Sequence, residues 1–203
     1  MTSSASTAGW RDLQRGAPEI ARLGMVRLAA ARVAMLGTLR PDGSPRISPV
    51  EPHIVNGHLL VGAMTWSKKA HDLLRDPRYV LHSVVSGPDN GEAELKLHGS
   101  AVPAAPGLRD AATAAWWSAQ EPGQAVVFSL RIATALYVEW DLEHGLMTIH
   151  RWSPRDGYSA TTRGYPKPAA KPTRSRSRRE VPPAVHAVEQ IGPRPVKGRG
   201  RGR

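Results

Sequence analysis

The spacing of apolar positions along the chain changes near residue 32. Between residues 10 and 31, apolar side chains recur every three or four positions, as in helices with one buried face. Gly16 and Pro18 interrupt this pattern, so we predict one or two short helices there. Beyond residue 32, short segments of β-forming residues alternate with turn residues, which is typical of an antiparallel sheet.

The β-rich region begins with a predicted meander of three strands, at residues 32–40, 45–55 and 58–64. Pro-Asp-Gly-Ser at 41–44 and Asn-Gly at 56–57 are the turns that join them, and Asn-Gly is a strong hairpin signal. Pro49 and Pro52 remove main-chain donors from the second strand. They therefore indicate a bulge or a sheet edge at this strand.

A short helix is predicted at residues 67–76, because Ser67 can cap its first turn and Pro77 stops its continuation. Farther along, we expect a helix at 108–119 and strands at 79–85, 92–102, 126–140 and 146–152. About seven short strands with few helices predict a mainly β fold, an antiparallel barrel.

The chain has 203 residues, of which 40% are hydrophobic, enough for one domain with a buried core. We expect three parts: a disordered segment with short helices at 1–31, the barrel at 32–158 and a disordered tail at 159–203. The absence of cysteine excludes disulfides and thiolate metal sites. No run of about 18 apolar residues and no secretory signal is present, so we expect a cytoplasmic protein without membrane contact.

The net charge of +11 belongs almost entirely to the C-terminal region. Residues 163–203 contain twelve Lys or Arg and two acids, whereas the other 162 residues contain 16 and 15. The same region holds seven prolines and five glycines and lacks apolar periodicity, which predicts disorder. Such a tail attracts polyanions, so weak nucleic-acid contact is one hypothesis and a solubilising extension the other.

One group of residues indicates a phosphate site. Ser67, Lys68 and Lys69 stand at the start of the predicted helix, where free N–H groups and the helix dipole attract an anion. Arg46, on the neighbouring predicted strand, can add a bidentate contact. Apolar ends of the same strands would enclose a flat ring, so the pattern indicates a site for a phosphorylated planar ligand.

These motifs, in this order, resemble the pyridoxamine 5′-phosphate oxidase-like family of FMN-binding split β-barrels. The resemblance spans about residues 20–155 and is strongest over 32–102, which contain Arg-Ile-Ser-Pro (46–49), Gly-Ala-Met-Thr (62–65) and Ser-Lys-Lys (67–69). It implies an antiparallel FMN-binding split barrel that forms a homodimer with cofactor sites at the interface. It also implies that Arg46, Ser67, Lys68 and Lys69 hold the FMN phosphate, and that the flavin ring is lined by the backbone of Ile47, Ser48, Met64 and Thr65.

The sequence departs from the true oxidase at two places. Glu94 stands where the oxidase has a glutamine that contacts the flavin, which makes it the ninth residue that the resemblance places at the cofactor. Arg-Trp-Ser-Pro at 151–154 is a poor match to the oxidase's substrate-binding Arg-Leu-x-Pro. Vitamin B6 oxidation is therefore not predicted. The resemblance implies an oxidoreductase that acts on a small molecule with FMN, or with the related 5-deazaflavin coenzyme.

No side chain is predicted to act as a general acid or base, because in hydride transfer the cofactor performs the chemistry. Some split-barrel relatives bind haem, but the eight histidines show no metal-binding spacing, so no metal site is predicted. From another functional class, the alternative is a dimeric scaffold that associates with nucleic acid through its tail.

Overall fold

The computed structural model describes residues 8–85, 92–113 and 123–164, all of which lie in one compact unit. Its four helices are α1 (Trp10–Gly16), α2 (Pro18–Ala31), α3 (Lys68–Arg75) and α4 (Pro106–Thr113). Its nine strands are β1 (Ala34–Leu39), β2 (Pro45–Val50), β3 (Pro52–Val55), β4 (His58–Met64), β5 (Arg78–Ser83), β6 (Ala93–Pro103), β7 (Ala125–Asp141), β8 (Leu146–Ser153) and β9 (Gly157–Gly164). No helix among these residues is long and apolar enough to cross a membrane.

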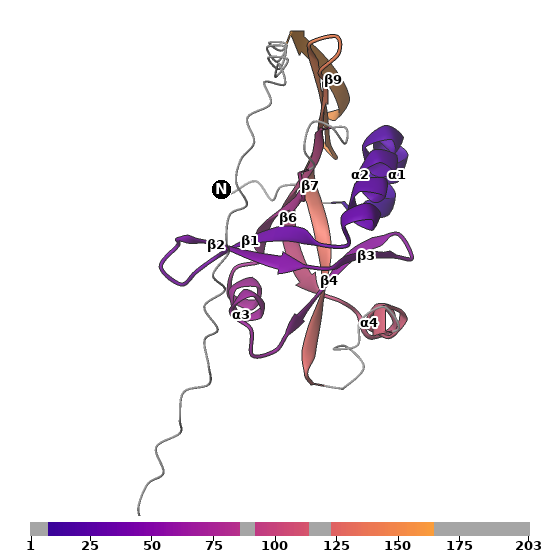
Figure 1. Ribbon diagram of the computed structural model, residues 1–203. Helices are drawn as coiled ribbons and strands as arrows, with labels where there is room; N and C mark the ends of the chain where they lie inside the picture. The colour runs from indigo at the N-terminus through magenta and orange to yellow at the C-terminus, as the bar shows by residue number, and fades with distance from the viewer. Residues whose placement is uncertain (1–7, 86–91, 114–122, 165–203) are drawn as a thin grey trace, which may run out of the picture. The chain divides into compact units, whose positions relative to one another are not determined.

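All described strand pairs are antiparallel, and the strand order is β2-β1-β5-β6-β7-β4-β3 (Figure 1). β8 pairs with the second half of β7, and β9 pairs with β8. β2 and β3 are separated by Glu51 alone, yet they stand at the two opposite ends of this strand order. The sheet therefore curls back on itself. Among the described strands no ladder joins β2 to β4, so the barrel is split at this seam.

Alternation along the strands places one face of the sheet in the core. In β1, β5 and β6 every second side chain is buried, and the most deeply buried include Leu36, Leu81, Leu95 and Leu97. α1 and α2 add Trp10, Leu13 and Ile20 to the same cluster. Burying large apolar side chains stabilises the fold by about 1.5–3 kcal/mol each. The barrel interior is thus a packed core and not an open channel.

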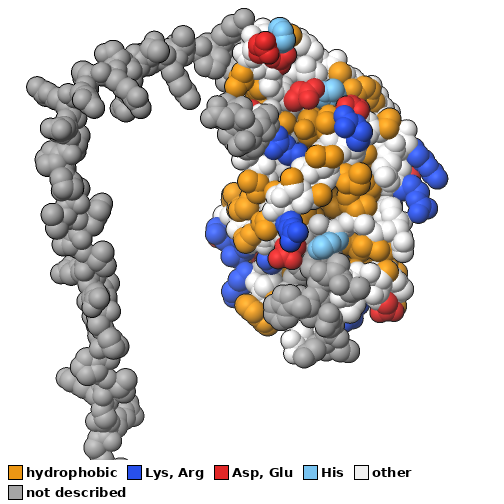
Figure 2. Space-filling view, turned by 45° about the vertical axis from the view of Figure 1, so that its right-hand side comes forward, with side chains coloured by type: hydrophobic (Ala, Val, Ile, Leu, Met, Phe, Trp, Pro, Cys, Tyr) orange, Lys and Arg blue, Asp and Glu red, His pale blue; other side chains and the backbone are white. Residues whose placement is uncertain are grey.

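Apolar side chains also remain at the surface. Figure 2 shows a broad area of hydrophobic side chains on one side of the molecule, flanked by lysine and arginine. The exposed large apolar residues include Trp66 and Ile47, at 76% and 70% exposure, together with Val26 of α2 and Met35 of β1. Exposed apolar area of this extent is typical of surfaces that bind a partner or a ligand.

The mainly β antiparallel fold, the break between the first two helices and the Ser67 cap are confirmed. Three expectations need correction. The predicted strand at 45–55 is two strands at opposite ends of the strand order, and the described residues form nine strands instead of about seven. The predicted tail boundary at residue 159 is too early, because β9 continues to Gly164.

β9 was missed because its sequence carries no burial pattern. All eight of its residues are exposed, and it is held by its ladder with β8 from Gly157↔Ser153 to Gly164↔Leu146. Main-chain pairing leaves no trace in side-chain polarity. The expected disordered residues at 165–203 lie outside the described part of the chain, as do residues 114–119 of the predicted helix at 108–119.

Candidate functional site

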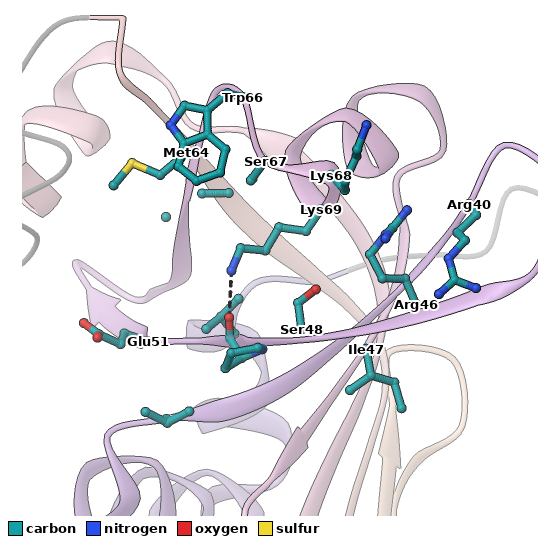
Figure 3. A pocket seen from close by; sticks show the side chains of 15 residues that line it. Arg40, Arg46, Ile47, Ser48, Glu51, Met64, Trp66, Ser67, Lys68 and Lys69 are labelled. Atoms are coloured by element: carbon teal, nitrogen blue, oxygen red, sulfur yellow. Dashed lines mark hydrogen bonds between the residues drawn. The ribbon is translucent and has the colours of Figure 1, made fainter. Parts of the chain in front are cut away.

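The split between β2 and β4 opens into a cavity of about 620 Å³, which the start of α3 closes on its third side. Figure 3 shows side chains from all three elements around it. Four cationic side chains line it: Arg40, Arg46, Lys68 and Lys69. Glu51 is the one acid among its lining residues. Ligand pockets commonly have volumes of about 300–1,000 Å³, so this cavity is large enough for a small organic molecule, and its lining carries mainly positive charge.

The start of α3 is built as an anion site. Ser67 has an extended backbone, and its hydroxyl accepts a hydrogen bond from the Ala70 amide at 3.4 Å. The next two residues are Lys68, which is exposed, and Lys69, which is half-buried. The first turn of a helix presents unpaired N–H groups and the positive end of its dipole. Since α3 has no acid in its first turn, nothing there offsets this positive charge.

Arg46 reaches the same region from β2. Its Nε donates to Oδ2 of Asp72 at 2.7 Å, and Asp72 lies in α3 with only 3% of its side chain exposed. Thr38 Oγ1 donates to the same carboxylate oxygen at 2.9 Å, and Arg75 lies 3.6 Å from the other oxygen. This network ties β2 to α3 and orients the guanidinium at the edge of the cavity.

Asp72 stays ionised in this network. Burial raises the pKa of its carboxyl, but the hydrogen bonds from Arg46 and Thr38, with the charges of Arg46 and Arg75, outweigh burial. The net effect is a pKa below the ordinary value of 3.8. Asp72 is therefore a fixed negative charge that holds Arg46 in place at neutral pH.

Lys69 crosses the cavity. Its Nζ donates a hydrogen bond to the main-chain oxygen of Pro49 at 2.8 Å, shown as the dashed line in Figure 3. Partial burial lowers the pKa of its ammonium group. The side chain therefore lies across the opening between α3 and β2, with its charge directed toward the ligand space.

The walls of the cavity follow from strand alternation. Arg46 and Ser48 point from β2 toward the cavity, whereas Ile47 between them points away from it (Figure 3). Ile47 is opposite Gly37 in the β1–β2 ladder. Met64 ends β4 at the cavity. A flat ring entering the split would therefore meet β2 on one side and the end of β4 on the other.

Seven of the nine residues predicted to bind a cofactor line this one cavity: Arg46, Ile47, Ser48, Met64, Ser67, Lys68 and Lys69. The structure does not bring the other two to it. The amide of Thr65 donates to the Gln124 oxygen at 2.9 Å and its hydroxyl to the same oxygen at 3.3 Å. Glu94 on β6 contacts His82 at 3.1 Å and pairs with Lys96.

Sequence reasoning missed three residues of the site. Arg40 and Glu51 line the cavity, but each stands between two strands, where polarity carries no positional signal. Trp66 precedes the Ser-Lys-Lys run, where its sequence position is compatible with stacking on a cofactor or with burial under the helix, and the structure places it exposed at the cavity. Asp72 was recognisable from the sequence pattern, because it is an acid between the buried positions Ala70 and Leu73 of α3. A buried carboxylate requires a partner, and the partner is Arg46. The described residues contain no group of three or more His, Cys, Asp or Glu placed to hold a metal ion.

Two solved structures share this architecture. PhzG from Burkholderia lata 383, in complex with tetrahydrophenazine-1-carboxylic acid, matches with a TM-score of 0.57 and 10% identity, over 76% of this chain and 93% of that one. A pyridoxamine 5′-phosphate oxidase-related, FMN-binding protein from Nostoc punctiforme PCC 73102 matches with a TM-score of 0.51 and 15% identity, over 78% and 99%. The chain therefore has the split-barrel fold of these proteins.

A haem-binding protein from Mycobacterium smegmatis also matches, with a TM-score of 0.47 and 15% identity, over 71% of this chain and 88% of that one. This score is too low to support a conclusion about the present chain. No protein-family model and no curated protein matches the sequence. The similarity to solved structures shows the fold alone.

Proposed function

We propose that this protein binds FMN in the split of its barrel and acts as a flavin-dependent oxidoreductase on a small molecule. The observation that carries the proposal is the convergence of Arg46, Ser67, Lys68 and Lys69 on one open cavity. A phosphate there would receive charge-assisted hydrogen bonds from three cations and from the N-terminus of α3. FMN supplies hydride and single-electron transfer when it is bound.

The residues of this chain fit such a ligand. The cavity has cations at the start of α3 and a slot between β2 and β4 that suits a planar group. The protein's own contribution is to hold the phosphate through Lys68 and Lys69 and to fix Arg46 through Asp72. Main-chain groups of β2 and β4 would orient the ring, which accords with the absence of a predicted general acid or base.

The 5-deazaflavin coenzyme is the alternative cofactor, since it also brings a phosphate to such a site. Titrating the cofactor-free protein with FMN and with the deazaflavin in parallel, followed by fluorescence, decides between them. Micromolar or tighter binding of one, lost in Arg46→Ala while the unfolding transition is retained, supports the proposal. Binding of neither contradicts it.

The expected homodimer is part of the same proposal. The outward face of β2 and β1 carries Ile47 and Met35, at 70% and 38% exposure, and no described helix covers it. Lys96 and His82, which are paired in the β5–β6 ladder, extend this face, and Glu94 contacts both. A second copy of the chain on this face would bury the apolar side chains and bring Glu94 into the interface.

Nucleic-acid contact through the C-terminal region is a second candidate. It is favoured by the twelve Lys or Arg against two acids in residues 163–203. Such a charge excess binds polyanions without sequence preference and releases counterions. Polyanion binding by this region would not compete with flavin binding in the barrel. The other 162 residues have a net charge of only +1, so the charge that attracts a polyanion lies outside the barrel.

A further inference from the structure

The cavity is chemically different at its two ends. Arg40 and Arg46 lie at one end, and Glu51, Met64 and Trp66 lie at the other (Figure 3). The first end suits a phosphate. The second combines a carboxylate, a thioether and an indole, none of which favours an anion.

Trp66 is the most exposed large apolar side chain among the described residues, with 76% of its surface open. Its indole stands beside Met64 at the rim of the cavity (Figure 3). An indole ring stacks on flat groups, and its electron-rich face attracts a cation more strongly than any other side-chain ring does. The neighbouring sulfur is polarisable and adapts to an aromatic guest.

Glu51 has a position fixed by the fold. It is the one residue between β2 and β3, and the ladders hold it from both sides, at Val50↔Ala34 and at Pro52↔Val61. Glu51 is exposed and is among the residues that line the cavity. A carboxylate at this place repels a second anion and attracts a positive charge or an N–H donor.

Lys69 marks the boundary between the two ends. Its ammonium is held by the carbonyl of Pro49, two residues before Glu51, and lies between Arg46 and Glu51 in Figure 3. The cations thus occur from Lys69 toward Arg46 and Arg40. Beyond Lys69, Glu51 is the charged side chain that lines the cavity.

We infer that the end of the cavity formed by Glu51, Met64 and Trp66 binds a planar group that carries a positive charge, such as an N-alkylated pyridine ring, and rejects an anionic one. This inference rests on the proposed function, in which the phosphate of FMN occupies the opposite end. It assigns the substrate class: a flat organic cation, not a second phosphate ester or a carboxylate.

Three ligands of nearly equal size test the inference: 1-methylnicotinamide, a cation; nicotinamide, neutral; and nicotinate, an anion. Each is titrated into the protein with and without saturating FMN, and binding is followed by tryptophan fluorescence and by calorimetry. With FMN bound, so that its phosphate occupies the cationic end, we expect the cation to bind at least about tenfold more tightly than the anion. Glu51→Gln removes this preference, and Trp66→Leu weakens binding of the cation and of the neutral ring.

Glu143→Gln is the matched control, because Glu143 is an exposed acid in the turn between β7 and β8. Equal binding of cation and anion with FMN bound, binding of the cation that is unchanged in Glu51→Gln, or no binding of any of the three ligands overturns the inference. FMN affinity, measured in the same samples, is a separate result. If FMN does not bind but the cation still binds more weakly to Glu51→Gln than to the wild type and to Glu143→Gln, the proposed function fails and the assignment of this end stands.

Discussion

The guanidinium of Arg46 on β2 is joined to the buried carboxylate of Asp72 on α3, Nε to Oδ2, at 2.7 Å. The pair connects the two elements that border the cavity. It uses one of the five N–H donors of the guanidinium. Asp72 thereby fixes a cation at the place where the sequence predicts a phosphate.

Asp72→Asn removes the charge that holds Arg46 but keeps the size of the side chain. We expect the free energy of unfolding to fall by about 1–3 kcal/mol, since a buried network loses its ionic partner. Urea denaturation measures the change. Asp76→Asn is the control: its partner Arg78 is 73% exposed, so its loss should cost at most about 1 kcal/mol. Equal losses in the two variants would contradict the role given to Asp72.

The lowered pKa of Asp72 also predicts a pH dependence. Because the folded-state pKa lies below the ordinary 3.8, the folded state binds the proton less readily than the unfolded chain does. The stabilisation is therefore complete above about pH 4–5 and is lost as the pH falls through the folded-state pKa. Asp76, whose pKa is lowered to about 2, adds a loss of the same sign.

The free energy of unfolding, measured between pH 5 and pH 2, therefore distinguishes the contribution of Asp72 from that of Asp76. Asp72→Asn should show a shallower loss of stability on acidification than the wild type, since one of the groups that take up protons on unfolding is gone. A slope identical to that of the wild type would show that Asp72 is not held below its ordinary pKa.

Ile47→Asp tests the homodimer. The side chain points away from the cavity and is 70% exposed, so the folded protomer tolerates a carboxylate there. If two copies pair through this face, the buried charge should weaken association by at least about tenfold. Sedimentation equilibrium gives the association constant. Val26→Asp, on the exposed side of α2, is the control. A wild-type protein that sediments as a monomer would contradict the proposal.

Removal of residues 165–203 tests the second candidate. The truncated chain keeps every described strand, including β9, and loses most of the charge excess. We expect the full chain to elute from heparin at a clearly higher salt concentration than the truncated chain, because salt weakens the attraction between the basic residues and heparin. FMN affinity should be the same in both. Equal retention on heparin would assign polyanion binding to the barrel.

The sequence predicted local features well and long-range pairing poorly. The Asn-Gly turn at 56–57 and the Ser67 cap are determined by neighbouring residues, and both are found as expected. Each half of residues 45–55 pairs with its neighbour in sequence, β1 or β4, but the two halves stand at opposite ends of the strand order. That division depends on how β5, β6 and β7 join the sheet between them, which no local pattern encodes. The pair of Arg46 and Asp72, 26 residues apart, also depends on how the chain closes in space, so the sequence did not predict it.

The candidate site was predictable to the extent that its residues are close in sequence. Ser67, Lys68 and Lys69 form one run, and a basic helix start is recognisable by itself. The acidic and aromatic end of the cavity was not predicted, because Glu51 and Trp66 become neighbours of one cavity only when the barrel closes.

The most direct test of the account is a comparison of FMN with riboflavin, which has the same ring and lacks the phosphate. Both are titrated into the wild type, into Lys68→Ala/Lys69→Ala and into the control Arg78→Ala. Two charge-assisted contacts correspond to about 1.5–3 kcal/mol each. The account therefore predicts that the wild type and the control bind FMN at least about 100-fold more tightly than riboflavin, and that this ratio collapses in the double variant. Equal affinity for the two ligands in the wild type, or a ratio unchanged in the double variant, would contradict the phosphate site at the start of α3.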